Sequence, residues 1–334
     1  MVVTYANYLA SKGHDVTIMA NKIDTVFQVR AKIQIISLIK NKLSTVLKAF
    51  TLNSDADVII ADIIAMIFLL SLRQHDKVLY FAQDYDVSYY KNPFLRFLTR
   101  TFYRISCRLF AIPTIAVSHD LGYQLTRDFG AKVSVVPNGV DTKIFYPERT
   151  EEYLSAKGKS RVVLILARSD YRKGYDIALD SLNRMSHEII KREVQVWSVG
   201  EIIPSTLPIR QFGLVSADDL RRILSCSDVL LYPSRHEGLP LFVLEAMACG
   251  CPVVTTKAVG FVSHGINALQ APIEDEETMA RLVIEVLHNS DLRESLIKAG
   301  HTTAEQMSLT DSMAAFENHI LHLFPAKNVP AGIN

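Results

Sequence analysis

The chain has 334 residues, of which 49% are hydrophobic and 21% charged, values that exclude a disordered or fibrous protein and predict about two domains. The net charge of +1 hides an asymmetry: residues 1–150 hold 18 Lys and Arg against 12 Asp and Glu, and residues 151–334 hold 18 against 23. A basic half indicates an anionic partner. The longest apolar run, residues 58–72, contains Asp62 and is too short to cross a bilayer. The first residues lack the pattern of a signal peptide, so we expect a cytoplasmic protein.

Metal-ligating patterns are weak. The four cysteines form no C-x-x-C pair and are expected to be buried free thiols. His319 and His322 share a helix face, but no third ligand is evident. We therefore expect no metal site and no cofactor.

Short β-branched segments alternate with longer amphipathic ones. In chain order, the expected strands are residues 15–20, 57–61, 77–82, 114–118, 132–136, 161–167, 194–199, 228–232, 252–255 and 267–271. Helical segments separate most of them, which is typical of βαβ units and parallel sheets. The strands are nearly continuous apolar runs, as sheets covered on both faces require. The fold class is α/β, with two doubly wound, Rossmann-like domains.

A charged, weakly apolar stretch at residues 141–160 predicts a linker between these domains. We expect an N-terminal domain over residues 1–148, a C-terminal domain over 155–305, and a terminal helix within 306–334. The chain opens on an amphipathic helix, whereas a doubly wound domain ordinarily opens on a strand. The pattern therefore predicts an N-terminal domain without its first strand and the loop after it.

The most informative segment is residues 227–256. A buried strand ends in a polar turn, and Pro240 suits the first turn of the helix that follows. Ligands of open α/β sheets bind outside the carboxyl ends of strands, where Gly238 allows close approach of the backbone. Two carboxylates flank this place. Glu245 is suited to accept hydrogen bonds from a ribose diol, and Glu237 from a sugar.

Arg168 and Lys173 lie in the loop after the expected strand 161–167, just before a helix. Two cations there would neutralise the charge of a bound diphosphate without a metal ion. The alternative is an ordinary pair of surface charges at a helix start.

Residues 227–256 closely resemble the E-x7-E signature of retaining GT-B glycosyltransferases, often called glycosyltransferase family 4, with Glu237 and Glu245 as the two glutamates. Residues 136–141, 167–174 and 211–228 resemble other segments of this family in order and spacing, with Ala167 in place of a usual glycine. The resemblance covers nearly the whole chain. It implies two domains that face a cleft, and a last helix that returns to the first domain.

The resemblance also implies the roles of the site residues. The donor would be a nucleotide-diphosphate sugar bound mainly on residues 160–300, with Glu237, Arg168 and Lys173 as the catalytic set. The donor-binding residues would be Glu245, Gly238, Leu239, Pro240, Asn138, Gly213 and Val215. The acceptor would enter from the first domain.

Asp84 and Asp86 follow an expected strand as a D-x-D triplet, which in the GT-A fold holds a metal ion. The second α/β domain favours GT-B instead, so Gln83, Asp84 and Asp86 are assigned to an acceptor-side loop. Many family members carry a histidine near Gln83. The string 83–86 resembles rhamnosyltransferases of bacterial surface polysaccharides.

Four arginines recur every fourth residue and predict one basic stripe on a helix: Arg96, Arg100, Arg104 and Arg108. Two readings stay open, a solvated helix face and a peripheral contact with anionic lipid on the inner face of a membrane. No nucleic-acid partner is expected.

The sequence thus predicts a retaining transferase of hexosyl or deoxyhexosyl groups, acting on a glycan or a lipid-linked acceptor in surface polysaccharide synthesis. One alternative is a truncated or degenerate homologue that serves as a weakly active binding or interaction protein. A nucleotide-sugar epimerase of similar architecture is disfavoured by Glu237 and Glu245 at this spacing.

Overall fold

The structure is a computed structural model that describes residues 1–20, 29, 32–35, 50–191 and 193–325. It divides into two compact units. Unit 1 comprises residues 1–136 and 312–334, and unit 2 comprises residues 137–311. The boundary at 136/137 lies earlier in the chain than the expected domain end at 148.

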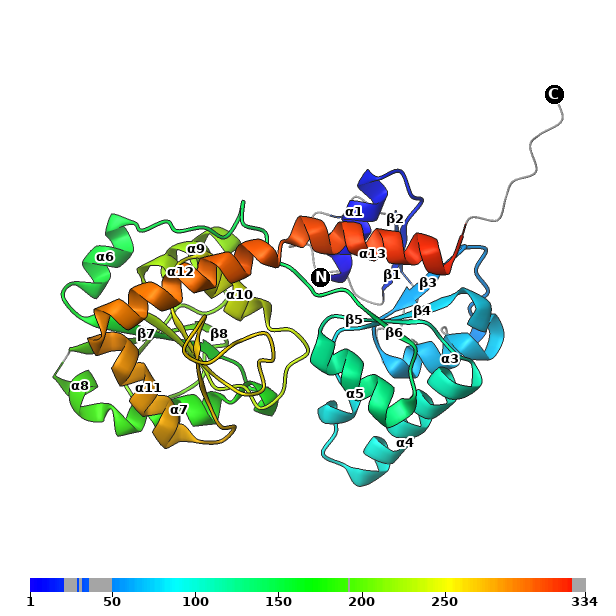
Figure 1. The fold of residues 1–334 in the computed structure, drawn as a ribbon. Helices are drawn as coiled ribbons and strands as arrows, with labels where there is room; N and C mark the ends of the chain where they lie inside the picture. Colours follow the sequence, from blue (N-terminus) through cyan, green and yellow to red (C-terminus); the bar gives the residue numbers. More distant parts are fainter. Residues whose placement is uncertain (21–28, 30–31, 36–49, 192, 326–334) are drawn as a thin grey trace. The chain divides into compact units, whose positions relative to one another are not determined.

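Unit 2 contains one six-stranded parallel sheet in the order β12-β11-β10-β7-β8-β9, of which Figure 1 labels β7 and β8. Its strands are β7 (Arg161–Ala167), β8 (Val194–Gly200), β9 (Ile209–Gln211), β10 (Val229–Tyr232), β11 (Val253–Thr256) and β12 (Leu269–Ala271). Its helices are α6 (Glu151–Lys157), α7 (Tyr175–Arg184), α8 (Ser186–Ile190), α9 (Ala217–Cys226), α10 (Leu241–Ala248), α11 (Glu276–His288) and α12 (Ser290–Gln306).

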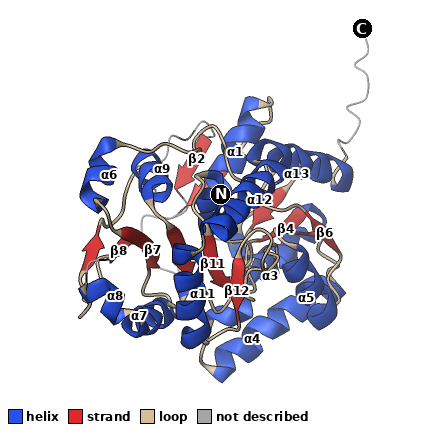
Figure 2. Ribbon diagram, turned by 60° about the vertical axis from the view of Figure 1, so that its left-hand side comes forward, coloured by secondary structure: helices blue, strands red, loops and turns tan. Residues whose placement is uncertain are grey.

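Helices cover both faces of this sheet (Figure 2). Successive residues of β7 point to opposite faces: Val162 and Leu164 pack with α9 and α10, whereas Val163 and Ile165 pack with α7 and α11. All four side chains are fully buried, as the unbroken apolar run predicted. The sequence pattern and the doubly wound architecture of this unit therefore agree.

The strand order reverses beside β7. From β7 the chain moves outward through β8 and β9, and it then returns to place β10 on the opposite edge of β7. In open α/β sheets, the loops that follow the two strands at such a switch point form the ligand site. Here they are residues 168–174 and 233–240, the two segments that the sequence had singled out.

Unit 1 contains a four-stranded parallel sheet in the order β3-β4-β5-β6 and a separate parallel pair, β1-β2. The strands are β1 (Thr17–Ala20), β2 (Lys32–Ile35), β3 (Ile59–Ala61), β4 (Val78–Ala82), β5 (Thr114–Ala116) and β6 (Val133–Val135). The helices are α1 (Val2–Ser11), α3 (Ile64–Gln74), α4 (Pro93–Arg104), α5 (His119–Phe129) and most of α13 (Leu309–Leu323).

The buried strand β4 organises the core of unit 1. Phe81 contacts Tyr5 of α1 and Phe316 of α13, and the hydroxyl groups of Tyr5 and Ser312 are 2.6 Å apart. Tyr80, which points to the other face, meets Tyr103 at the end of α4, with their hydroxyl groups 2.8 Å apart. The last helix thus packs on the first helix.

Three elements differ from the sequence expectations. β2 and β9 were not expected, and α6 lies inside the stretch that was expected to be a linker. Tyr153 of α6 is buried against Trp197 and Phe212, so this stretch belongs to the core of unit 2. The four cysteines are buried and free, as expected. No helix in the described ranges is both long and apolar enough to cross a membrane.

Candidate active site

The loops after β7 and β10 lie directly against each other. Gly174 has a φ of +67°, and a Cβ atom there would overlap the carbonyl oxygen of Pro233. The backbone N–H of Arg235 donates to the carbonyl of Arg172 at 2.7 Å. Only glycine meets both the left-handed conformation and the close approach, so Gly174 fixes the distance between the two loops.

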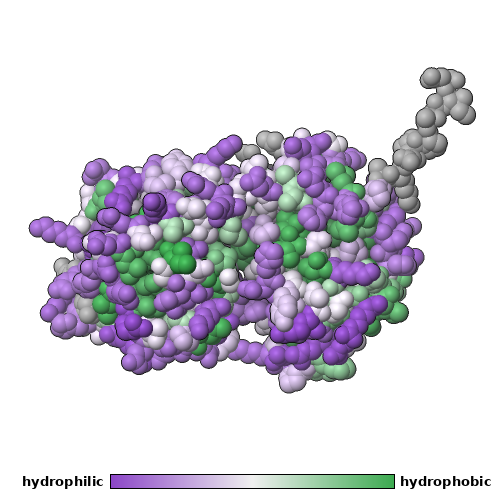
Figure 3. Space-filling view, viewed as in Figure 1, coloured by the Kyte–Doolittle hydropathy of each residue, from purple (hydrophilic) through white to green (hydrophobic). Residues whose placement is uncertain are grey.

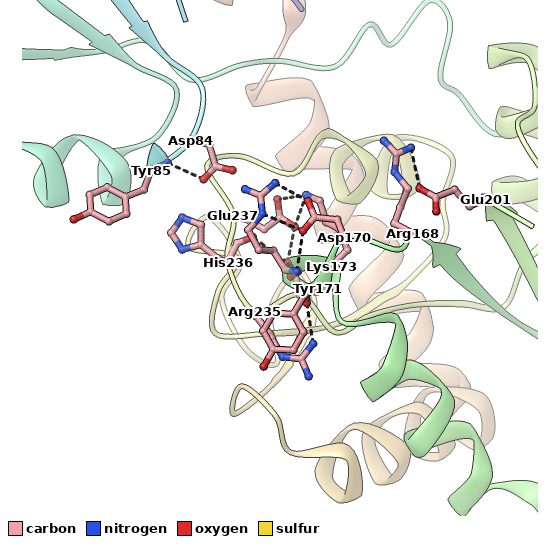
Figure 4. Close-up of polar contacts among 12 residues, drawn as sticks. Asp84, Tyr85, Arg168, Asp170, Tyr171, Lys173, Glu201, Arg235, His236 and Glu237 are labelled. Carbon is pink, nitrogen blue, oxygen red and sulfur yellow. Dashed lines mark hydrogen bonds and ion pairs between the residues drawn. The ribbon is translucent and has the colours of Figure 1, made fainter. Parts of the chain in front are cut away.

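Glu237 is a buried charged group at the centre of these two loops, and Figure 4 shows its contact with Lys173. Its side chain is only 5% exposed, and the ammonium of Lys173 donates to both carboxylate oxygens at 2.9 and 2.8 Å. The hydroxyl groups of Tyr232 and Ser234 donate to Oε1 at 2.7 and 2.6 Å. A buried carboxylate with a cation and two further donors is fully satisfied, so its position is fixed.

The electrostatics of this cluster favour an anionic ligand near Lys173. Burial and the adjacent Glu237 carboxylate raise the pKa of Tyr232 well above its usual value, so the phenol remains a neutral donor. The side chain of Lys173 is 24% exposed, so a ligand can reach it. A phosphate oxygen is a suitable partner for its ammonium.

Glu245 lies in the second turn of α10. Burial raises the pKa of this carboxyl group to about 7. Its carboxylate makes no hydrogen bond or ion pair with any other residue in the part of the chain that the structure describes. A desolvated carboxylate without a partner is suited to accept hydrogen bonds from hydroxyl groups of a ligand.

Arg168 follows β7 but does not join the Lys173–Glu237 pair. Its guanidinium points to Glu201, which follows β8, with Nη1 and Oε1 3.9 Å apart (Figure 4). Glu201 also accepts a hydrogen bond from the backbone N–H of Ser169 at 3.0 Å. Hydrogen bonds from the side chain and the backbone of Ser169 lower the pKa of Glu201. The two cations expected to converge therefore lie at the same sheet edge with different partners.

Arg235 connects three loops through hydrogen bonds. Its guanidinium donates to both carboxylate oxygens of Asp176 at 2.8 and 2.7 Å, to Glu274 at 2.8 Å and to the carbonyl of Tyr171 at 2.8 Å. It also stacks over the Tyr171 ring, 3.8 Å from the centroid. The planar fork of arginine suits this many acceptors. We call Arg235, Asp176, Glu274 and Tyr171 the Arg235 clasp.

Two sequence models of known protein families match this chain. The sequence model described as "Glycosyltransferase Family 4" matches residues 1–144, and the one described as "Glycosyl transferases group 1" matches residues 160–289. The chain belongs to the group 1, family 4 glycosyltransferases. The expected family is thus confirmed.

Individual relatives agree with this assignment. The lipopolysaccharide core biosynthesis glycosyltransferase LpsE of Rhizobium meliloti is 29% identical over 163 residues, 45% of this chain and 46% of that protein. The chain spans about half the length of the first curated relatives it matches, 55%, 46% and 50%.

Solved structures show the fold. A sucrose-phosphate synthase from Thermosynechococcus elongatus superposes with a TM-score of 0.80 at 19% identity, covering 98% of this chain and 93% of that one. Anabaena Alr3699/HepE in complex with UDP and glucose gives 0.70 at 17% identity, covering 87% and 86%. The expected GT-B fold, with two parallel-sheet α/β domains, is confirmed.

The other donor-binding residues expected for this family 4 protein all belong to unit 2. Gly238, Leu239 and Pro240 follow Glu237 directly, and Pro240 caps α10. Gly213 has a φ of +71° and its carbonyl accepts from the N–H of Gly200 at 2.8 Å. Val215 packs against the core, and Asn138 is buried at the start of unit 2. Their contacts with a donor remain predictions.

The acceptor-side residues belong to unit 1. Asp84 accepts a hydrogen bond from the backbone N–H of Tyr85 at 2.7 Å, and Gln83 is half-buried beside it. Asp86 is 2% exposed, and its carboxylate accepts from the N–H of Ile64, the first residue of α3, at 2.6 Å. Burial raises the pKa of Asp86 to about 7. This geometry favours Asp86 as the cap of α3 rather than as a contact for an acceptor.

Sequence reasoning missed Tyr232, Ser234, Arg235 and Glu201. The available signal was their position, because each follows or ends a central strand of unit 2, where ligands of open sheets bind. The described residues contain no group of three or more His, Cys, Asp or Glu side chains arranged to hold a metal ion.

Proposed function

We propose that this family 4 protein transfers a sugar, with retention of configuration, from a nucleotide-diphosphate sugar to a glycan or lipid-linked acceptor in surface polysaccharide synthesis. The observation that carries the proposal is the Lys173–Glu237 pair at the switch point of unit 2, with the unpartnered Glu245 on the adjacent helix. The names of LpsE and of the Anabaena complex with UDP and glucose support this class of donor and pathway.

Each group then has a defined task. Glu245 accepts hydrogen bonds from the ribose hydroxyls, and Lys173 binds the diphosphate. As the glycosidic bond breaks, negative charge accumulates on the departing phosphate oxygen, and the fixed ammonium of Lys173 stabilises it. Arg168 lies at the same sheet edge and is 48% exposed, so it can turn from Glu201 to the diphosphate at little cost.

Glu237 is poorly suited to act as a nucleophile. Its carboxylate already accepts hydrogen bonds from Lys173, Tyr232 and Ser234, which withdraw charge from both oxygens. A covalent glycosyl–enzyme intermediate on this residue is therefore disfavoured. Retention would instead follow from attack by the acceptor on the face from which the diphosphate leaves, and Glu237 would hold Lys173 in place.

The test is release of nucleoside diphosphate from a panel of UDP-, GDP-, ADP- and dTDP-sugars, with a membrane glycolipid extract as the acceptor. We expect transfer to continue in EDTA, because Lys173 supplies the positive charge. The Lys173→Met variant should lose about 100- to 1,000-fold in rate, whereas Lys143→Met, an exposed lysine elsewhere in unit 2, should retain activity. The anomeric proton in the NMR spectrum of the product reports retention.

Two outcomes would contradict the proposal. Loss of activity in EDTA that Mn²⁺ restores would assign charge neutralisation to a metal ion instead of Lys173. Binding of a nucleotide sugar without any transfer would support the alternative, a weakly active binding or interaction protein.

A further inference from the structure

Two threonines end strand β11 in the interior of unit 2. Thr255 and Thr256 are both fully buried, as are Val253 and Val254 directly before them. Figure 3 shows hydrophilic residues over much of the surface of unit 2, whereas apolar clusters fill the interior around the sheet. A buried hydroxyl group costs free energy unless it is hydrogen-bonded, and valine has nearly the same shape without this cost. Packing alone therefore does not explain why the strand ends in threonine.

The threonine hydroxyl groups bond the end of the neighbouring strand, β10. Oγ1 of Thr255 donates to the carbonyl oxygen of Tyr232 at 2.7 Å, and Oγ1 of Thr256 donates to the carbonyl oxygen of Ser234. The backbone N–H of Ala258 donates in turn to Oγ1 of Thr256 at 3.2 Å. The two threonines thus fix the backbone at the place where β10 ends and the next loop begins.

The two residues held in this way are the two whose hydroxyl groups bond Glu237. The hydroxyl oxygens of Tyr232 and Ser234 lie 2.7 and 2.6 Å from Oε1 of Glu237. Oγ of Ser234 also lies 2.9 Å from the carbonyl oxygen of Arg172, which belongs to the loop after β7. A short series of contacts therefore runs from β11 through Ser234 to the carboxylate that bonds Lys173.

We propose that Thr256 and Ser234 are positioning residues for the transfer reaction. They fix the carboxylate of Glu237, which in turn holds the ammonium of Lys173 against the diphosphate. Neither residue needs to touch the donor, because both are fully buried. We call the connection Thr256–Ser234–Glu237 the hydroxyl chain. This inference rests on the proposed function and deepens it, since it adds the residues that hold the charged pair to those that bind the donor.

The exact position of Lys173 matters more for the rate than for binding. The diphosphate of a bound donor already carries negative charge, and an ammonium attracts it from several nearby positions. In the transition state new charge gathers on one oxygen, and its stabilisation depends on the distance from that oxygen. Lysine has a flexible side chain, so Glu237 must supply the fixed position. A displacement of about 1 Å would therefore lower kcat strongly and change the KM for the donor little.

The alternative is that the threonine hydroxyl only stabilises the end of a strand. Thr114 of β5 has such a role, since it is 1% exposed and its Oγ1 donates to the carbonyl oxygen of Ile112 at 3.3 Å. The two threonines differ in what lies beyond the carbonyl group. For Thr256 it is Ser234, whose own hydroxyl contacts Glu237. Thr114 is therefore the matched control.

The first test measures kcat and the donor KM of the intact chain, with the donor that the wild type uses among UDP-, GDP-, ADP- and dTDP-sugars. Ser234→Ala and Thr256→Val should each lower kcat about tenfold and change the KM by less than about twofold. Thr256→Ser keeps the hydroxyl group and should recover most of the rate. Thr114→Val should keep the wild-type kcat, whatever its effect on the melting temperature. Unchanged kcat in Thr256→Val, or an equal loss in Thr114→Val, would overturn the inference.

A second test separates this inference from the proposed function. Reductive methylation with labelled formaldehyde gives each lysine an NMR signal, and the signal missing in Lys173→Met belongs to Lys173. This signal should shift in Thr256→Val and return in Thr256→Ser, because it depends on the distance to the carboxylate of Glu237. If the wild type transfers no sugar, the proposed function fails, and a shifted signal still supports the hydroxyl chain as the support of Lys173. An unshifted signal in Thr256→Val would overturn the inference even in an active enzyme.

Discussion

The central residue of the site is Glu237, whose carboxylate joins a lysine, a phenol and a hydroxyl group. Its proximity to Lys173 could be expected, because the two residues follow expected strands that are adjacent at a switch point. The roles of Tyr232, Ser234 and Arg235 could not, because they depend on the conformations of two loops. Those conformations rest on one close approach, Gly174 against Pro233.

Glu245 provides a pH-dependent test at the scale of one residue. Its pKa is raised to about 7 by burial, so its ionised fraction increases as pH rises from about 6 to 8. Ribose hydroxyls donate to the ionised form, and the affinity for a nucleoside diphosphate should therefore increase over this range. Calorimetric titration with UDP, GDP and ADP at several pH values measures the effect.

The Glu245→Gln variant should lose this pH dependence and bind about 1.5–3 kcal/mol more weakly at pH 8, the value of hydrogen bonds to a charged group. Glu285→Gln, which changes an exposed glutamate of α11, is the matched control and should behave as the wild type. A pH dependence that persists in Glu245→Gln would show that another group, such as the phosphate of the ligand, causes it.

At the scale of elements, the sequence predicted the buried strands well and the edge strands poorly. β7 and β10 are continuous apolar runs, and their burial on both faces makes the pattern unambiguous. β2 and β9 were missed because they are short and contain polar residues, as edge strands do. α6 was missed because its charged residues indicated a linker, although Tyr153 anchors it to the core.

The Arg235 clasp makes a prediction about how three loops are held together. A lysine ammonium has three donors on one atom and cannot reproduce the four hydrogen bonds and the ring stacking of the planar guanidinium, so Arg235→Lys should behave almost as Arg235→Ala. Both variants should weaken nucleotide binding, because the clasp holds the loop that carries Lys173 against the loop that carries Glu237. Nucleotide affinity measured by calorimetry is the readout, with melting temperature recorded beside it.

If Arg235 acts by positioning the two loops, a free cation of the same shape should replace it in part. Free guanidinium ion at millimolar concentration should restore part of the nucleotide affinity of Arg235→Ala, since it can occupy the vacated place between Asp176 and Glu274. Arg184→Ala, which removes one exposed ion pair with Glu276, is the control and should leave affinity unchanged. Wild-type nucleotide affinity in Arg235→Ala would show that the Arg235 clasp does not contribute to nucleotide binding.

At the scale of the whole molecule, the sequence predicted two α/β units and the α/β class of each. The basic half of the chain corresponds largely to unit 1, which carries α4, and the acidic half largely to unit 2. The position of the boundary between the two units was harder to predict from the sequence. Val140 pairs with Ser308, which is far from it in the sequence. A contact between such distant residues produces no local sequence pattern.

The central claim is that unit 2 binds a nucleotide-diphosphate sugar through Lys173 and Glu245, and titration of the intact chain with UDP-, GDP-, ADP- and dTDP-sugars tests it most directly. The account predicts that at least one of these donors binds. It also predicts that Lys173→Met and Glu245→Gln each weaken that binding by at least about tenfold, or 1.4 kcal/mol, while Lys143→Met leaves it unchanged. Binding of no donor, or wild-type affinity in both variants, would contradict the claim.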